Sequence, residues 1–236
     1  MAKQCSNGKR VRKARESLLK PIYPLSEALM VLDGYREKYK AKFDETVEVV
    51  FALGIDAKQS DQMVRGSALM PYGLGKVIRV AAFVKAEKVE AAMSAGAHMA
   101  GNDDLVDLVK AGKLDFDVCV STPDMMPKIA SLGKILGPKG MMPNPKLGTV
   151  GEDIVGIIKR VKAGQVEFKV EKAGIIHAGV GKLSFGNDAL LANIRALYDA
   201  IVAVKPQAAK GIFMQKMYIS TSQGVSIALD LASIAH

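Results

Sequence analysis

The chain has 236 residues, of which 49% are hydrophobic and 24% charged, which supplies enough apolar material for one large or two modest domains and excludes a wholly disordered protein. Its net charge of +9, from 33 Lys and Arg against 24 Asp and Glu, is compatible with a polyanionic partner and equally with simple solubility. Cys5 and Cys119 form no metal or disulfide framework, and no segment resembles a signal sequence or membrane span, so we expect a cytoplasmic protein without a membrane partner.

The first twenty residues are strongly basic, with seven Lys and Arg against the single acidic residue Glu16. Such a segment is either a solvated tail or a basic arm that lies on phosphates, and the composition allows both. Two elements are predicted next: a helix at 26–32 with Ser26 as its N-cap, and a strand at 46–53 in which apolar residues recur at every second position.

From residue 68 onward, strands alternate with helices, which is typical of a parallel sheet covered on both faces. The predicted elements are a strand at 77–83, helices at 87–95 and 103–111, a strand at 118–120 and a helix at 125–136. Asn102 or Asp103 is the expected cap of the second helix.

The last part of the chain returns to strict alternation. A strand at 165–170 is predicted to pair with one at 175–180 across the turn at 172–174, followed by a helix capped by Asp188 and a final strand at 216–222.

The two ends of the chain therefore share one pattern and the middle has another. We predict a split two-layer α+β domain, residues 1–67 and 160–236, with an inserted three-layer α/β domain of Rossmann-like type at 68–159. The split domain would hold +8 of the net charge of +9, so a polyanion would bind there.

The segment 132–150 is the most distinctive in the chain. Its glycines permit positive φ, its prolines stiffen the backbone, and its lysines add charge. The prolines and lysines are Lys134, Pro138, Lys139, Pro143, Pro145 and Lys146. A rigid connecting turn and a phosphate-binding loop both remain open.

Within this segment, GPKGMMPNPKLGTV at 137–150 resembles the signature of the bacterial L1 family of ribosomal proteins. Four further stretches resemble blocks of that family in the same order, namely residues 41–66, 70–76, 162–185 and 210–224. The resemblance covers nearly the whole chain. It implies the split domain with an inserted domain on two flexible connections. Gly66 lies close to the outgoing connection and Gly148 and Gly151 flank the returning one, so we predict hinges there.

The resemblance also implies a function. Members are structural constituents of the large ribosomal subunit, not enzymes, and bind large-subunit (23S) ribosomal RNA at the mobile stalk near the tRNA exit site. It further implies transient contact with exit-site tRNA, help with the release of deacylated tRNA, and repression of translation from the messenger RNA of the protein's own operon. We expect a monomer when free, without cofactor or metal.

Carried over residue by residue, the resemblance assigns RNA contacts in three blocks. They are Lys42, Phe43, Thr46 and Glu48; Lys169, Lys172, Gly174, His177 and Lys182; and Thr221, Ser222 and Gly224. Lysines suit phosphates, hydroxyls and backbone amides suit 2′-hydroxyls, and an aromatic ring stacks on a sugar or base. The chain departs from the family pattern at Tyr72, Val170, Glu171 and Gln223, which puts the contacts at 170, 171 and 223 in doubt.

Other functional signals are weak. The run Gly73-Leu74-Gly75-Lys76 lacks the first glycine of a P-loop and the hydroxyl that would bind magnesium, and the three histidines have no ligand spacing. Two competing functions stay open: an enzyme that holds a nucleotide or phosphorylated metabolite at the strand ends of the middle domain, and a translational regulator that is not part of the ribosome.

Overall fold

The computed structural model describes residues 9–16, 18–38, 41–56, 59–112, 114–209 and 211–234, so Cys5, His236 and the start of the basic segment lie outside the described residues. The chain divides into two compact units: unit 1 comprises residues 1–75 and 166–236, and unit 2 comprises residues 76–165. The predicted borders at 67/68 and 159/160 fall inside β2 (Arg65–Leu69) and α7 (Ile154–Lys162). With the observed borders, unit 1 carries 20 basic and 14 acidic residues, a net charge of +6 rather than +8, because Arg160 and Lys162 belong to unit 2.

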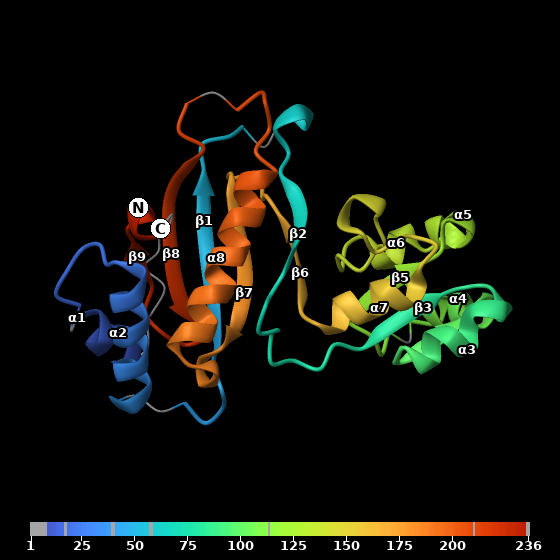
Figure 1. The fold of residues 1–236 in the computed structure, drawn as a ribbon, viewed down its shortest axis with the longest axis horizontal. Helices are drawn as coiled ribbons and strands as arrows, with labels where there is room; N and C mark the ends of the chain where they lie inside the picture. The colour runs from blue at the N-terminus through green and yellow to red at the C-terminus, as the bar shows by residue number, and fades with distance from the viewer. Residues whose placement is uncertain are drawn as a thin grey trace. The chain divides into compact units, whose positions relative to one another are not determined.

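Unit 1 is built on a four-stranded antiparallel sheet of order β7-β1-β8-β9. The strands are β7 (Ile175–Lys182), β1 (Thr46–Leu53), β8 (Met214–Thr221) and β9 (Ile227–Leu229). Alternate residues of β1, such as Val49 and Phe51, are buried against α2 (Leu25–Lys38) and α8 (Asn187–Ala203), and α8 lies in front of the sheet in Figure 1. Each such side chain contributes about 1.5–3 kcal/mol.

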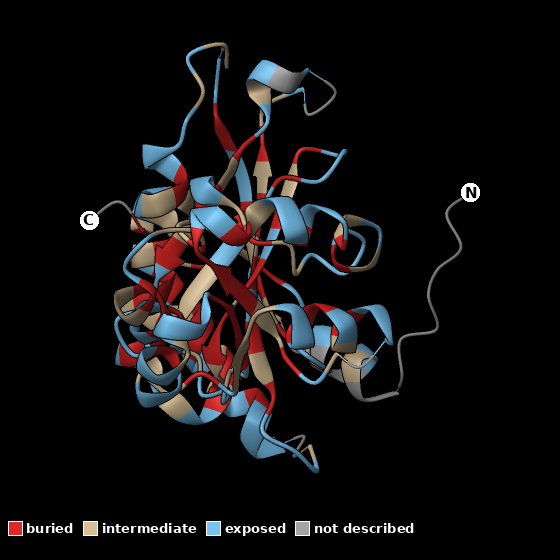
Figure 2. Cartoon of the chain, turned by 90° about the vertical axis from the view of Figure 1, so that its right-hand side faces the viewer, coloured by how far each residue is buried: buried red, intermediate tan, exposed pale blue. Residues whose placement is uncertain are grey.

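The other residues of β1 point away from this core. Thr46, Val50 and Ala52 are half-buried and Glu48 is exposed. We call this side of the four-stranded sheet the open face. It consists of these four residues of β1 and of the residues that lie beside them, on the same side of the sheet, in β7, β8 and β9. Figure 2 colours the described residues by how far each is buried.

The predicted hairpin between 165–170 and 175–180 is wrong. β6 (Gln165–Lys169) pairs with β2 in a separate two-stranded sheet, and β7 pairs with β1. The turn at 171–174 directs the chain to β1, where the Leu53 amide donates to the Gly174 carbonyl at 2.8 Å. Sequence proximity favoured the hairpin, but β1, with eight residues and a buried apolar face, is the longer partner for β7, whereas β6 has only five residues.

Unit 2 contains a three-stranded parallel sheet of order β4-β3-β5, made by β4 (Met99–Gly101), β3 (Val80–Phe83) and β5 (Val118–Ser121). Val80 and Ala82 pack with α3 (Ala86–Ser94) and α7, whereas Ala81 and Phe83 pack with α4 (Asp103–Lys110), α5 (Met126–Ala130) and α6 (Gly133–Leu136). Both faces are therefore covered, and unit 2 has the three-layer α/β arrangement that its alternating pattern predicted.

Several predicted boundaries need correction. The helix at 125–136 is broken into η2 (Pro123–Met125), α5 and α6, and Ser131 Oγ donates to the Lys128 carbonyl at the break. The strand at 77–83 begins only at Val80. Ser26 and Asp188 lie inside the first turns of their helices and are not caps.

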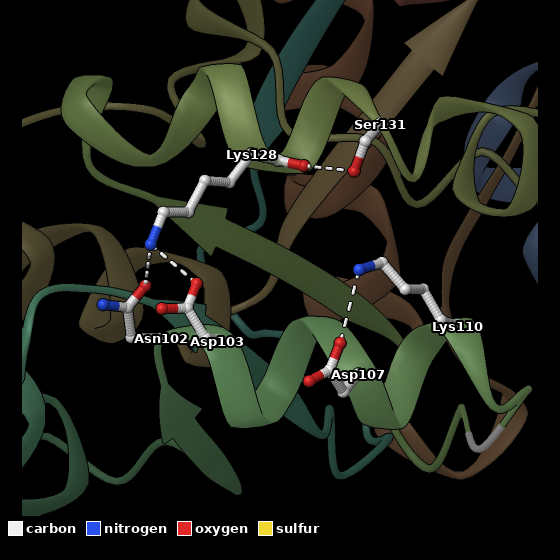
Figure 3. A network of polar contacts seen from close by, with 6 residues as sticks. All are labelled: Asn102, Asp103, Asp107, Lys110, Lys128 and Ser131. Atoms are coloured by element: carbon white, nitrogen blue, oxygen red, sulfur yellow. Dashed lines mark hydrogen bonds and ion pairs between the residues drawn. The ribbon is translucent and has the colours of Figure 1, made fainter.

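Helix α4 is fixed by a polar network at its first turn. Asn102 occupies the N-cap position, but its side chain makes no capping bond and instead accepts from Lys128 Nζ at 3.1 Å, while Asp103 accepts from the same ammonium at 2.6 Å (Figure 3). Lys128 thus ties α5 to the start of α4.

Some elements were not predicted: α1 (Lys9–Glu16), β2, β4, α7, β9, and the short 3-10 helices η1 (Ser60–Gln62), η3 (Pro145–Leu147), η4 (Leu183–Phe185) and η5 (Leu231–Ser233). Among the described residues, no helix is both long and apolar enough to span a membrane.

Candidate nucleic-acid interface

The predicted RNA contacts of unit 1 are spread along the open face and its two ends. Thr46 pairs with Lys182 and Val50 pairs with His177 across the β1–β7 ladder. Because side chains alternate along a strand, Thr46, Glu48 and His177 share one side of the sheet. Glu48 and His177 are exposed there.

The start of β1 is held by a cluster of hydroxyls. Ser222 Oγ accepts from the Thr46 amide at 3.1 Å, and the Ser222 amide donates to the Thr46 carbonyl at 3.0 Å. Lys182 Nζ donates to Thr46 Oγ1 at 2.8 Å and to the Asp44 carbonyl at 3.3 Å. Ser222 and Lys182 therefore already have structural partners, and an RNA contact from either would use their remaining hydrogen-bonding capacity.

Thr221 differs from its neighbour. It pairs with Val47 and is 5% exposed, and its Oγ1 has no hydrogen-bond partner beneath Gly224. A Cβ at Gly224 would collide with this hydroxyl, so the close turn requires glycine. The Gln223 carbonyl accepts from Tyr35 Oη at 3.1 Å, which anchors the same loop. The loop is shaped by the backbone at 223 and 224, whereas the Thr221 side chain faces the core.

The turn residues lie at the opposite end of β1. Gly174, at φ +76°, is buried against the carbonyl of Leu53, and Lys172 is exposed beside it. Seven residue steps separate Thr46 from Leu53, or roughly 23 Å at about 3.3 Å per residue. Lys169 is exposed on β6, in the other sheet. The predicted contacts thus form an extended surface rather than one pocket.

Lys42 and Phe43 line a hollow of about 730 Å³ next to the Thr46 end. The Phe43 side chain is 50% exposed. Arg36 from the last turn of α2 also lines it and donates to the Leu183 carbonyl at 3.3 Å. The remaining lining residues are Asp33, Glu37, Ala41, Asp44, Glu45, Leu183 and Ser184. With two cations and four carboxylates, the hollow suits base edges or sugar hydroxyls better than phosphates. Arg36 was not predicted, because only a long-range contact places it here.

Residues 35–225 match the Ribosomal protein L1p/L10e family. The chain belongs to this family. It is 51% identical over 239 residues to the large ribosomal subunit protein uL1 of Rickettsia bellii (strain OSU 85-389), which covers 100% of this chain and 98% of that protein. It is 50% identical over 231 residues to the protein of the same name from Rickettsia canadensis (strain McKiel), covering 98% of this chain and 95% of the relative.

The three glycines predicted as hinges have well-defined places. Gly66 is buried inside β2, where an added Cβ would come within 2.8 Å of the Phe168 ring. Gly148 ends η3 at φ +71°, and the Gly151 amide donates to the Ser121 carbonyl at 3.1 Å, both within unit 2. The units divide after Gly75 and after Gln165, so all three glycines lie inside a unit rather than at its border.

The stretch before the first border is anchored by a residue that sequence reasoning missed. Asn193 of α8 is completely buried, accepts from the Tyr72 amide at 3.1 Å, and donates to the carbonyls of Gly73 and Val180 at 3.0 and 2.8 Å. A polar residue on the apolar stripe of a helix was the available signal. The same contacts tie Gly73, the first residue of the run 73–76, to α8. The element that follows the run is β3 rather than a helix, so the run lacks the helix N-terminus of a phosphate loop.

The beginning of unit 2 is held by Asp117. Its carboxylate accepts from Lys76 Nζ at 3.0 Å and from the Arg79 amide and side chain at 3.1 and 3.3 Å. Partial burial raises the pKa of Asp117, but these hydrogen bonds outweigh it and lower the pKa to about 2. The arrangement is that of a structural ion cluster with no free carboxylate for acid–base chemistry.

The glycine- and proline-rich segment is a tied turn in unit 2. The Asn144 amide donates to Thr149 Oγ1 at 2.8 Å, and the Lys146 amide donates to Asn144 Oδ1 at 2.9 Å. Val150 forms an isolated bridge with Ser121. These contacts favour the rigid connection over a dedicated phosphate loop. Among the residues that the structure describes, no group of His, Cys, Asp and Glu could hold a metal ion.

Proposed function

We propose that this chain is a structural constituent of the large ribosomal subunit that binds large-subunit ribosomal RNA through unit 1, and that it is not an enzyme. The observation that carries the proposal is the end-to-end similarity, 51% over 239 residues, to a protein named large ribosomal subunit protein uL1. Its working place would accordingly be the ribosome in the cytoplasm.

The chemistry of unit 1 is consistent with this role. The net charge of +6 attracts a phosphate backbone, and the exposed lysines at 42, 169 and 172 are spread over the surface as a helical RNA requires. The backbone of the 222–224 loop and the hydroxyls beside it offer the small polar groups that meet 2′-hydroxyls.

At the finer level, we propose that the RNA is the mobile stalk of 23S ribosomal RNA near the tRNA exit site. The protein would contact the exit-site tRNA transiently, assist the release of deacylated tRNA, and repress translation of its own operon messenger RNA. The support for this proposal is that several stretches of the chain resemble blocks of the L1 family and follow in the same order, in particular residues 41–66 and 210–224.

Filter binding to a 23S stalk fragment across a salt series tests the RNA assignment. We expect log K to fall linearly with log salt, and Lys172→Gln to reduce the slope by about 0.7–0.9 if that exposed lysine meets one phosphate. Lys134→Gln in unit 2 is the matched control, since Lys134 is also exposed and is no predicted contact. Salt-independent binding, or equal losses in the two variants, would refute the electrostatic assignment.

Two further assays address the finer claims. Co-sedimentation with large subunits at high salt separates a ribosomal constituent from a free regulator of translation. A reporter preceded by the leader of the protein's own operon should lose expression when the protein is supplied, and unchanged expression would remove the repressor role while leaving the ribosomal role intact.

A further inference from the structure

Four residues lie side by side across the open face of unit 1. Val50 pairs with His177 on one side and with Tyr218 on the other, and Tyr218 pairs with Ala228. His177 is exposed and the other three are half-buried, whereas their neighbours along each strand, such as Ile219, are buried. The row therefore runs from a predicted RNA contact, His177, to the far edge of the sheet.

The row ends in a hollow of about 450 Å³ at the β8–β9 edge. Its lining includes Tyr218, the small side chain of Ala228, and residues 21–22, which we call its outer wall. The other lining residues are Gln215, Lys216, Met217, Leu229, Asp230 and Leu231. A hollow of this size is in the range that holds a small ligand.

The outer wall of the hollow is fixed. The Tyr23 amide donates to the Ala228 carbonyl at 3.0 Å, and the Tyr23 carbonyl accepts from the Asp230 amide at 2.9 Å. Tyr23 Oη accepts from the amides of Leu19 and Lys20, both at 2.9 Å. Ile22 stays 56% exposed on this wall, although a neighbouring apolar hollow is available. The site is thus preformed rather than a gap between loose segments.

We infer that this hollow binds one unpaired nucleotide of the RNA, with its base against Tyr218 and over Ala228 and its phosphate near Lys216. The inference rests on the proposed RNA-binding function and extends it to residues outside the predicted contacts. An aromatic ring on an open sheet surface is a stacking platform for unpaired bases, and the adjacent cation matches the nucleotide's charge. Continuity of the row with His177 is the reason that RNA, rather than a protein side chain, is the occupant.

The test measures affinity of the full chain for the 23S stalk fragment. Ala228→Leu fills the hollow from an outward-facing position, and Tyr218→Leu removes the ring. We expect each to weaken binding about tenfold, since base–aromatic stacking is of that order. Tyr218→Phe keeps the ring, and Ala203→Leu changes an exposed residue at the end of α8 that does not line the hollow, so both should bind within about twofold of wild type. Unchanged circular dichroism melts confirm that each variant is folded.

A second measurement does not depend on the variants. RNA containing 4-thiouridine, irradiated in complex with the wild-type chain, should cross-link to the lining residues at 215–218 or 228–231. Cross-links confined to 42–48 and 222–224, or wild-type affinity in both Ala228→Leu and Tyr218→Leu, would overturn the inference while leaving the proposed function standing. Loss of association with large subunits at unchanged RNA affinity would also overturn it, in favour of a protein occupant. A wild-type chain that does not bind the fragment would refute the proposed function itself.

Discussion

Replacing Asn193 by Asp should strongly destabilise unit 1. The side chain is fully buried and makes three hydrogen bonds, accepting from Tyr72 and donating to Gly73 and Val180. A carboxylate keeps the acceptor but loses both donors, so two carbonyl oxygens face a negative charge. The Gly73 carbonyl can regain water because its neighbour Tyr72 is 60% exposed, but the Val180 carbonyl is buried. One unpaired buried group costs about 1–3 kcal/mol and the second lost bond about 1 kcal/mol, giving about 3 kcal/mol in total.

Urea unfolding followed by far-ultraviolet circular dichroism measures this loss, because the chain contains no tryptophan. Burial raises the pKa of an introduced carboxyl above its unfolded value, so the penalty is largest at neutral pH and shrinks as the pH falls, when a protonated Asp can donate one bond. Asn187→Asp, in the first turn of the same helix, is the matched control and should change stability by less than about 0.5 kcal/mol. A loss below about 0.5 kcal/mol in Asn193→Asp at pH 7 would refute the reasoning.

Three further outcomes are expected. Asp117→Asn should lower the stability of unit 2 by about 1–2 kcal/mol at pH 7, and the difference should vanish between about pH 4 and pH 2, because the folded pKa lies below the unfolded value of 3.8; melts across this pH range measure it. Gly174→Ala should cost about 1–2 kcal/mol, since φ is +76° and the new Cβ would lie 3.1 Å from the Leu53 carbonyl oxygen; equal melting temperatures would contradict this. Ser222→Ala should lower the stability of the free protein by about 1 kcal/mol, because the Thr46 amide loses its hydrogen-bond partner. A variant that loses RNA affinity but keeps its stability would show that this hydrogen bond does not stabilise the start of β1.

The sequence predicted the strands of unit 1 well where one face is apolar. The strand at 46–53 matches β1 residue for residue, because its buried positions recur strictly at every second residue. Pairing was harder to predict. Periodicity states which side of β6 and β7 is apolar but not which strand lies beside it, so the hairpin was wrong. Helix boundaries failed for a local reason: Ser26 and Asp188 have the residue type of a cap but sit inside longer helices.

The candidate site was predicted as a set of residues but not as a shape. Lys42 and Phe43 lie at one end of β1 and Gly174 at the other, a separation that no linear motif reveals. Arg36 and Asn193 were missed because their roles depend on contacts with Leu183 and with the 72–73 backbone, far away in sequence. The hinge role of Gly66, Gly148 and Gly151 stays a prediction. The structure adds a packing reason for glycine at 66, because an added Cβ would lie 2.8 Å from the Phe168 ring.

Adjacent hydroxyls at 221 and 222 show how fold and recognition are coupled in this surface. A motif of consecutive Thr and Ser suggests two equivalent contacts, yet successive residues of a strand point to opposite sides. Thr221 accordingly faces the core opposite Val47, while Ser222 bonds to both the amide and the carbonyl of Thr46. The hydroxyl next to the proposed RNA surface therefore also fixes the start of β1. A substitution at Ser222 can therefore weaken RNA binding in two ways, by removing an RNA contact and by displacing the start of β1. Measuring both the RNA affinity and the stability of the free protein separates the two contributions.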